Sequence, residues 1–239
     1  MSSSPEPQCL DIIARVHTPF KEKFGIPRQP GLAAAKGRIE MLPPWNRPEL
    51  FDGLGEYSHI WLNFLFHQAQ PAGWRDKVRP PRLGGNTKKG VFATRSPFRP
   101  NHLGLSVVKL LGLQVQAGSV VLEVEGVDLL DQTPIVDIRP YVPYVDAIPD
   151  ARSGFSPAAP EKRLAVVFSP QADKQLLEME PSANEAKDLI RDLLSLDPRP
   201  AYHKDERRIY GMRLFDVNVK WSVDEDQVTV HAVEADPSV

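Results

Sequence analysis

Cysteine is almost absent from this chain, because Cys9 is the only one among 239 residues. A single thiol excludes both an intramolecular disulfide and a thiolate metal cluster. The six histidines show no HExxH motif or other ligand spacing, so we predict no metal site. No apolar run reaches 18 residues, and the N-terminus lacks the apolar core of a signal peptide. We therefore expect a cytoplasmic protein.

The glycine motifs of nucleotide-binding folds are also missing. Gly53-Leu54-Gly55 lacks the third glycine of GxGxxG, and no P-loop is present. A cofactor held on a Rossmann sheet is therefore unsupported.

Proline, by contrast, is abundant, with 24 residues, about twice average usage. This favours short strands and structured loops over long helices. Alternating or continuous apolar runs predict six or so strands, separated by turns and without interleaved helices. They are residues 11–17, 37–42, 58–67, 105–115, 119–127 and 135–141. Such a series predicts a mainly β barrel or strongly curved sheet. The run 58–67 is apolar on both faces, which favours a strand buried on two sides.

Composition divides the rest of the chain. Residues 1–8 are expected to be a disordered tail, and residues 9–145 form the barrel. Residues 146–162 are rich in Pro, Ala and Ser and are typical of a linker. Residues 163–239 then form a small α+β domain. It should contain a strand at 164–168, two helices and a terminal hairpin, with a Ser182–Glu185 capping box at the second helix.

Positive charge is concentrated in one segment. Residues 71–110 hold nine Lys or Arg and one Asp, a net charge of +8, whereas the whole chain carries −2. A single-sign segment of this kind favours a polyanionic partner. The alternative is an ordinary solvated face, although such faces usually mix signs.

A stiff loop lies inside this basic segment. Val91-Phe92-Ala93 predicts a short strand, which leads into Thr94-Arg95-Ser96-Pro97-Phe98-Arg99-Pro100-Asn101. Two prolines three residues apart restrict the backbone without making it helical. Such a loop can hold a ligand with little loss of entropy. The alternative is a surface crossover with solvated arginines.

Several long motifs resemble the TrmO family, also called TsaA-like or YaeB-like. The residues that carry the resemblance are GVFATRSPFRPNHLGLSVVKL, VDLLDQTPIVDIRPYVPYVD, KEKFGIPRQPG, FHQ at 66–68 and DPRPAY at 197–202. Together they span essentially the whole chain. Two positions depart from the family pattern: His102-Leu103 replaces Pro-Ile, which should leave the loop slightly freer, and Gln132 replaces a turn glycine.

The resemblance implies an S-adenosylmethionine-dependent tRNA methyltransferase that acts as a homodimer. Its cofactor would be held by loops of the barrel, without a Rossmann sheet. Carried over by position, the cofactor-binding residues are Pro27, Arg28, Gln29, His67, Gln68, Arg95, Leu105, Asp128, Leu129, Leu130 and Asp131. An arginine suits the carboxylate of this cofactor, and an apolar wall suits its adenine. All of these residues precede the linker, so we expect the barrel alone to bind the cofactor.

The implied reaction methylates the exocyclic nitrogen of threonylcarbamoyladenosine next to the anticodon. That nitrogen is a poor nucleophile until it loses its proton, so a general base would help. The candidates are Asp128, Asp131, Asp137, Tyr141 and His67, and the sequence does not choose among them. An aspartate in a turn often only caps backbone amides, and Tyr141 can equally be a packing residue.

Basic and aromatic residues in two segments are candidates for tRNA binding. They are Lys88, Lys89, Arg99, Arg199, Tyr202, Lys204 and Arg207. Stacking on an aromatic side chain suits the unpaired bases of an anticodon loop. The alternative for residues 197–202 is an ordinary connector between a helix and a strand, without a role in RNA binding. Two other functions stay open: a non-catalytic RNA-binding adaptor, and a small-molecule methyltransferase.

Overall fold

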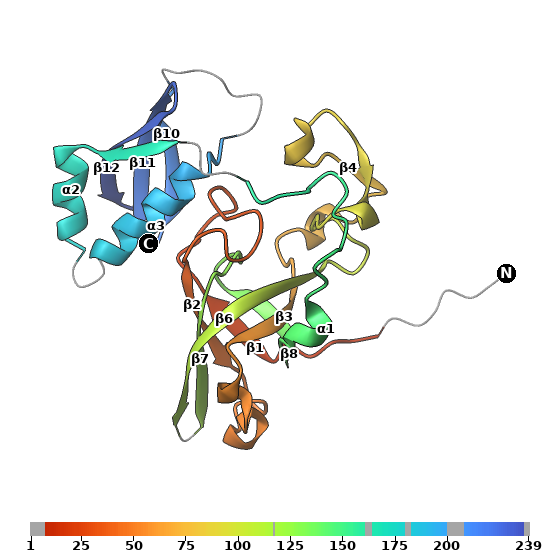
Figure 1. Cartoon of the computed structure of the whole chain (residues 1–239). Helices are drawn as coiled ribbons and strands as arrows, with labels where there is room; N and C mark the ends of the chain where they lie inside the picture. Colours follow the sequence, from red (N-terminus) through yellow and green to blue (C-terminus); the bar gives the residue numbers. More distant parts are fainter. Residues whose placement is uncertain (1–7, 117, 161–163, 180–182, 200–207, 237–239) are drawn as a thin grey trace.

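A closed barrel followed by a smaller mixed sheet makes up the fold (Figure 1). The computed structural model describes residues 8–116, 118–160, 164–179, 183–199 and 208–236. The barrel strands are β1 (Ala14–His17), β2 (Lys36–Met41), β3 (His59–Leu65), β6 (Leu103–Gln116), β7 (Ser119–Glu125) and β8 (Thr133–Pro140). They are antiparallel and close in the order β1-β2-β7-β6-β3-β8. The predicted barrel is confirmed.

The barrel interior is filled by alternate residues of each strand. On β3, for example, Ile60, Leu62 and Phe64 are buried, whereas the residues between them are partly exposed. The prediction that this strand is buried on two sides is therefore wrong. A barrel strand turns one face to the interior, and only the other face can meet loops or solvent.

Short elements join the barrel strands. They are η1 (Pro48–Phe51), η2 (Leu54–Glu56), η3 (Gln70–Ala72), β4 (Lys77–Val78), η4 (Pro81–Leu83), β5 (Lys89–Gly90) and η5 (Val91–Ala93), and the short helix α1 (Pro143–Asp146) follows the last barrel strand. The elements from η3 to η5 form a lobe between β3 and β6, and we call residues 71–102 the basic lobe. Val91–Ala93 is a 3-10 turn, so the predicted strand is wrong there. The Thr94 backbone N–H and its hydroxyl both donate to the Val91 carbonyl, which closes the turn.

The C-terminal sheet has the order β10-β11-β12-β9 and carries both long helices. Its elements are β9 (Ala165–Phe168), α2 (Pro170–Leu177), α3 (Ala183–Ser195), β10 (Tyr210–Leu214), β11 (Val217–Asp224) and β12 (Gln227–Ala235). The terminal hairpin and the first helix agree with the prediction, and Ser169 caps α2 by accepting from the Ala172 N–H. The pattern missed β10. The predicted capping box involves Ser182, which lies outside the described residues.

None of the helices in the described part of the chain is long and apolar enough to cross a membrane.

Candidate functional site

Four segments meet at one end of the barrel. There β1 and β3 end, and β6 and β8 begin, as the pairs Val16–Thr133 and Leu65–Leu103 show. The segments are the β1–β2 loop (residues 18–35), the turn after β3 (66–69), the loop before β6 (94–102) and the β7–β8 turn (126–132). The sequence had placed its cofactor residues in these segments or next to them.

Hydrogen bonds join the β1–β2 loop to the other three segments. Lys23 Nζ donates to the Gln68 carbonyl at 3.2 Å, and Arg95 Nη1 donates to Gln29 Oε1. Lys21 Nζ lies 2.9 Å from Asp131 Oδ2. Predicted residues that are far apart in sequence therefore lie in one cluster, with the β1–β2 loop as the common partner.

Arg95 is exposed, two residues after the end of η5. Among the described residues, Gln29 is the one hydrogen-bond partner of its side chain. A guanidinium has five N–H donors in a planar fork, so most remain for a carboxylate ligand. This arrangement suits the role that the sequence assigned to it.

Internal hydrogen bonds hold the loop around Arg95 in one conformation. Ser96 Oγ accepts from the Phe98 N–H at 3.3 Å, and Arg99 Nη1 donates to the Thr94 carbonyl at 2.7 Å. His102 adopts a left-handed φ of 51° and its Nδ1 lies 2.9 Å from the Pro97 carbonyl. The histidine that replaces the family's proline therefore adds a hydrogen bond to the loop, whereas we had expected a slightly freer loop. Arg99 points into its own loop, which weakens its assignment to tRNA.

Asp128 has the most unusual environment of the candidate bases. Ser106 Oγ donates to its Oδ1 at 2.6 Å. Burial raises the pKa of Asp128 to about 6, although the Ser106 hydrogen bond and the nearby Arg95 charge oppose that shift. A carboxylate with such a pKa is still ionised at pH 7 and is a stronger base than an exposed aspartate, which suits proton abstraction.

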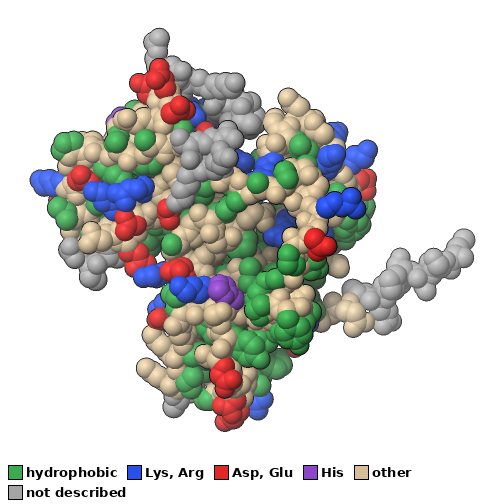
Figure 2. Space-filling model, viewed as in Figure 1, with side chains coloured by type: hydrophobic (Ala, Val, Ile, Leu, Met, Phe, Trp, Pro, Cys, Tyr) green, Lys and Arg blue, Asp and Glu red, His purple; other side chains and the backbone are tan. Residues whose placement is uncertain are grey.

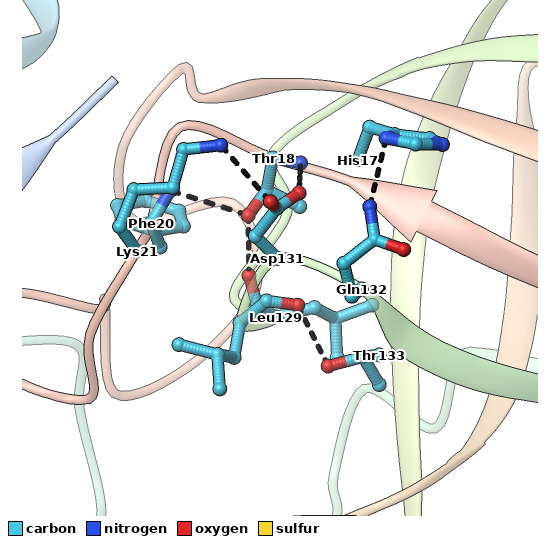
Figure 3. Close-up of polar contacts among 9 residues, drawn as sticks. His17, Thr18, Phe20, Lys21, Leu129, Asp131, Gln132 and Thr133 are labelled. Atoms are coloured by element: carbon cyan, nitrogen blue, oxygen red, sulfur yellow. Dashed lines mark hydrogen bonds and ion pairs between the residues drawn. The ribbon is translucent and has the colours of Figure 1, made fainter. Parts of the chain in front are cut away.

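Asp131, three residues later, has both carboxylate oxygens in use (Figure 3). Oδ1 accepts from the Thr18 N–H at 2.9 Å, and Oδ2 pairs with Lys21. The same turn contains Gln132 at a φ of 62°, where glycine would be unstrained, and Gln132 Nε2 lies 3.0 Å from His17 Nδ1. These contacts make Asp131 a structural anchor for the start of the β1–β2 loop.

Replacing Asp131 with alanine should lower stability by about 1–3 kcal/mol, because a partly buried N–H and a lysine would lose their acceptor. Asp131→Asn keeps an acceptor for Thr18 and should cost less. Chemical denaturation of both variants checks this order. If Asp131→Ala is as stable as the wild type, the anchoring role is wrong.

Two other candidate bases lie away from the cluster or are otherwise engaged. Asp137 accepts from the Ile138 N–H at 3.0 Å and from Arg139 Nε at 2.8 Å. Tyr141 lies at the opposite end of β3, where its N–H bonds to the His59 carbonyl and its ring contacts Trp61. None of these contacts of Asp137 and Tyr141 involves the four segments at the barrel end.

His67 lies inside the cluster. Burial lowers its pKa, and the charges of Arg15 and Lys23 act in the same direction, whereas a hydrogen bond to Leu65 opposes it. The imidazole is therefore neutral at pH 7. It is the second candidate that can accept a proton.

The remaining cofactor candidates differ in exposure. Arg28 and Leu105 are exposed, Pro27 is buried, and Leu129 and Leu130 have buried side chains. The carbonyls of Leu129 and Leu130 accept from the hydroxyls of Thr18 and Thr133 at 2.9 and 2.7 Å. Because the side chains of Leu129 and Leu130 are buried, they belong to the core, and only the backbone of these residues can face a ligand.

The candidate tRNA-binding residues also differ in their surroundings. Lys88 and Lys89 are exposed on the basic lobe, where Lys and Arg side chains gather (Figure 2). Arg199 donates to both carboxylate oxygens of Asp197, at 2.7 and 2.9 Å, and this pairing raises its pKa. Tyr202, Lys204 and Arg207 lie outside the described residues.

Sequence reasoning missed Ser106 and the lysines of the β1–β2 loop. A serine at a buried position of an apolar strand was a signal for Ser106, since a buried hydroxyl needs a partner. The partners of Lys21 and Lys23 are more than 40 residues away in sequence, and no local pattern marks them.

Comparison with known proteins finds family matches along both parts of the chain. Residues 15–147 match the tRNA-methyltransferase O N-terminal domain, and residues 161–236 match the TrmO C-terminal domain. The tRNA (adenine(37)-N6)-methyltransferase of Escherichia coli K12 is 44% identical over 225 residues, which cover 93% of this chain and 96% of that protein. A Pseudomonas aeruginosa protein, provisionally named S-adenosylmethionine-dependent methyltransferase RcsF, is 51% identical over 212 residues, 87% of this chain and 90% of its own.

A solved structure is similar over nearly the whole chain. The crystal structure of TrmO from Pseudomonas aeruginosa superposes with a TM-score of 0.79 at 40% identity, and the match covers 96% of this chain and 99% of that one. Both the fold and the sequence thus agree along the barrel and the C-terminal sheet. The chain belongs to the tRNA-methyltransferase O family.

Proposed function

We propose that this chain is an S-adenosylmethionine-dependent tRNA (adenine(37)-N6)-methyltransferase that acts on threonylcarbamoyladenosine. The observation that carries the proposal is the cluster at the barrel end, where Arg95 of the basic lobe meets Gln29 and lies near Asp128. The residues present fit the cofactor. Arg95 has donors for a carboxylate, Gln29 can accept from a hydroxyl, and Leu105 offers apolar surface.

Asp128 is our choice for the general base. When bound, S-adenosylmethionine would supply an electrophilic methyl group, whose bond to sulfur breaks as its bond to the exocyclic adenine nitrogen forms, so that S-adenosylhomocysteine leaves. Asp128 takes the proton that this nitrogen loses, so no positive charge builds up on the nitrogen during methyl transfer. Ser106 holds the carboxylate in one orientation, and Arg95 helps keep it ionised. Positioning of the two substrates can contribute roughly 7–11 kcal/mol, and a base a further factor of about 100 to 10,000.

The direct test is a reaction with purified components. The chain is incubated with S-adenosylmethionine and tRNA that either carries or lacks the threonylcarbamoyl group, and nucleosides are separated by mass spectrometry. We expect one added methyl group on the modified adenosine only. Methylation of both tRNAs would contradict the substrate assignment, and methylation of neither would contradict the function.

The other two functions make different predictions. A non-catalytic adaptor would bind tRNA and show no heat of S-adenosylmethionine binding in calorimetry. A small-molecule methyltransferase would bind the cofactor but show no salt-sensitive affinity for tRNA.

Charge on the basic lobe should govern tRNA affinity. We expect Lys88→Glu to weaken tRNA binding and to flatten its dependence on salt concentration, because one phosphate contact is lost. Lys174→Glu on α2 is the matched control, with the same charge change on an exposed lysine outside the lobe. Binding is measured by fluorescence anisotropy at several salt concentrations. Equal slopes in the two variants would place the tRNA surface elsewhere.

A homodimer and a cytoplasmic location are also part of the proposal. The apolar side chains around α1 support self-association, since Tyr144, Val145 and Ile148 are 89%, 61% and 65% exposed. Light scattering of the purified chain measures its mass, and a monomer at micromolar concentration would contradict the dimer. The cytoplasmic location follows from the proposed tRNA substrate.

A further inference from the structure

The β1–β2 loop, which carries Gln29, rests on the C-terminal sheet. Phe20 forms a β-bridge with Leu214, and both side chains are buried. The Phe215 N–H donates to the Pro19 carbonyl at 2.7 Å, and Glu22 Oε1 accepts from the Arg213 N–H at 2.9 Å. The loop lies between the barrel and this sheet in Figure 1.

An aromatic stack continues the contact. The ring of Phe24 is parallel to that of Trp221 within 7°, with centroids 6.5 Å apart, and Trp221 in turn stacks on Tyr210 at 4.7 Å. Trp221 is fully buried, whereas Phe24 is only partly so. The tryptophan is therefore a fixed platform against which the loop ring lies.

Close approach of the Gly25 backbone to the Met212 side chain completes the contact. Gly25 has a left-handed φ of 87°, and a Cβ there would lie 2.2 Å from Met212 Sδ. Only glycine satisfies both conditions. Residues 19–25 are thus shaped by β10 and β11.

The same loop makes the contacts of the candidate cofactor site. Lys23 reaches Gln68, and Gln29 meets Arg95, within a few residues of Phe24 and Gly25. We propose that the C-terminal sheet is part of the cofactor site, and that Trp221, Met212 and the Glu22–Arg213 contact position the loop for S-adenosylmethionine. A loop ordered in advance loses less entropy when the ligand binds.

This inference rests on the proposed function, and it departs from the expectation that the barrel alone binds the cofactor. In the structure, the loop that connects the predicted cofactor residues has one side on the barrel and the other on a sheet that begins after the linker. A chain cut near residue 162 should therefore lose cofactor affinity as well as any tRNA contacts of the second domain.

Trp221→Leu in the full chain is the main test. It removes the stacked ring, so we expect the Kd for S-adenosylmethionine in calorimetry to rise roughly three- to tenfold. In turnover, the KM for the cofactor should rise while the KM for tRNA stays within about twofold, because Trp221 is buried and cannot touch tRNA. Trp221→Phe should restore the affinity. Trp221 Nε1 has no hydrogen-bond partner in the described part of the chain, so phenylalanine loses no bond there.

Val223→Ala is the matched control for lost stability. Val223 is buried on the same strand at the next inward position, and shortening it weakens the sheet without removing a described contact to the loop. Hydrogen exchange of residues 19–29 should be faster in Trp221→Leu and unchanged in Val223→Ala. If Trp221→Leu does not fold, Glu22→Ala against Glu22→Gln makes the same comparison at the Arg213 N–H.

The outcomes separate the two claims. Wild-type cofactor affinity in Trp221→Leu, or in Glu22→Ala if that pair is used, would overturn the inference alone. An equal loss of affinity in Val223→Ala would also overturn it, because general destabilisation would then suffice. A wild-type chain that binds no S-adenosylmethionine would overturn the proposed function itself.

Discussion

Replacing Arg95 with alanine is expected to abolish measurable S-adenosylmethionine binding while the fold survives. A bidentate contact between a guanidinium and a carboxylate is charge-assisted, and its loss should cost about 2–5 kcal/mol. The side chain is exposed and has one described hydrogen bond, to Gln29, so little stability depends on it. Calorimetry on the folded variant measures the affinity, and circular dichroism checks the fold.

Two further variants sharpen this test. Arg95→Lys keeps the charge but not the planar fork, so it should recover only part of the affinity. Arg82→Ala removes an arginine from the same basic lobe, where its Nη1 donates to Ser156 Oγ at 2.6 Å, outside the four segments. That variant should bind the cofactor normally. Wild-type affinity in Arg95→Ala would show that another group holds the carboxylate.

Replacing Asp128 with asparagine is expected to lower kcat by about 100- to 10,000-fold and to leave cofactor affinity within a few fold. Asparagine is nearly isosteric and can still accept the Ser106 hydrogen bond, but it cannot take a proton. Single-turnover methylation of tRNA measures the chemical step. Asp137→Asn is the matched control, with the same chemical change at a carboxylate outside the cluster. A normal rate in Asp128→Asn would leave His67 as the candidate base.

The pH dependence follows from the raised pKa of about 6. The base form of Asp128 is lost as pH falls through this value, so the wild-type rate should fall in the same range. Asp128→Asn should lack that decline. For stability the sign is opposite: a carboxyl whose pKa is raised by folding favours the fold most below its unfolded pKa, and that contribution is lost as pH rises through about 6. Asp128→Asn should therefore melt no lower than the wild type at pH 7.

Local pattern was enough to predict the barrel. Alternating apolar residues in β2 and a continuous apolar run in β7 mark strands whatever lies elsewhere in the chain. The cofactor candidates came from long motifs, and the structure brings Gln29, Gln68 and Arg95 together through hydrogen bonds across the β1–β2 loop. Which of them touch a ligand stays a prediction.

Features that depend on individual hydrogen bonds or on distant contacts were not predictable from such patterns. Val91–Ala93 has the composition of a strand, yet it forms a turn because Thr94 closes on the Val91 carbonyl. The strand β10 alternates buried Tyr210, Met212 and Leu214 with outward residues, but it is only five residues long, and its pairing with β11 defines it. The stacking of Phe24 on Trp221 joins residues almost 200 positions apart, and no local pattern around either residue predicts this contact.

The most direct test of the central claim is a crystal structure of the chain with S-adenosylhomocysteine, the product that keeps the carboxylate and the adenosine of the cofactor. We expect a ligand at the barrel end where the four segments meet. Its carboxylate should lie within hydrogen-bond distance of the Arg95 guanidinium, with the Asp128 carboxylate facing the sulfur side of the ligand. A ligand bound elsewhere on the chain, or bound at this end without contact to Arg95, would contradict the account.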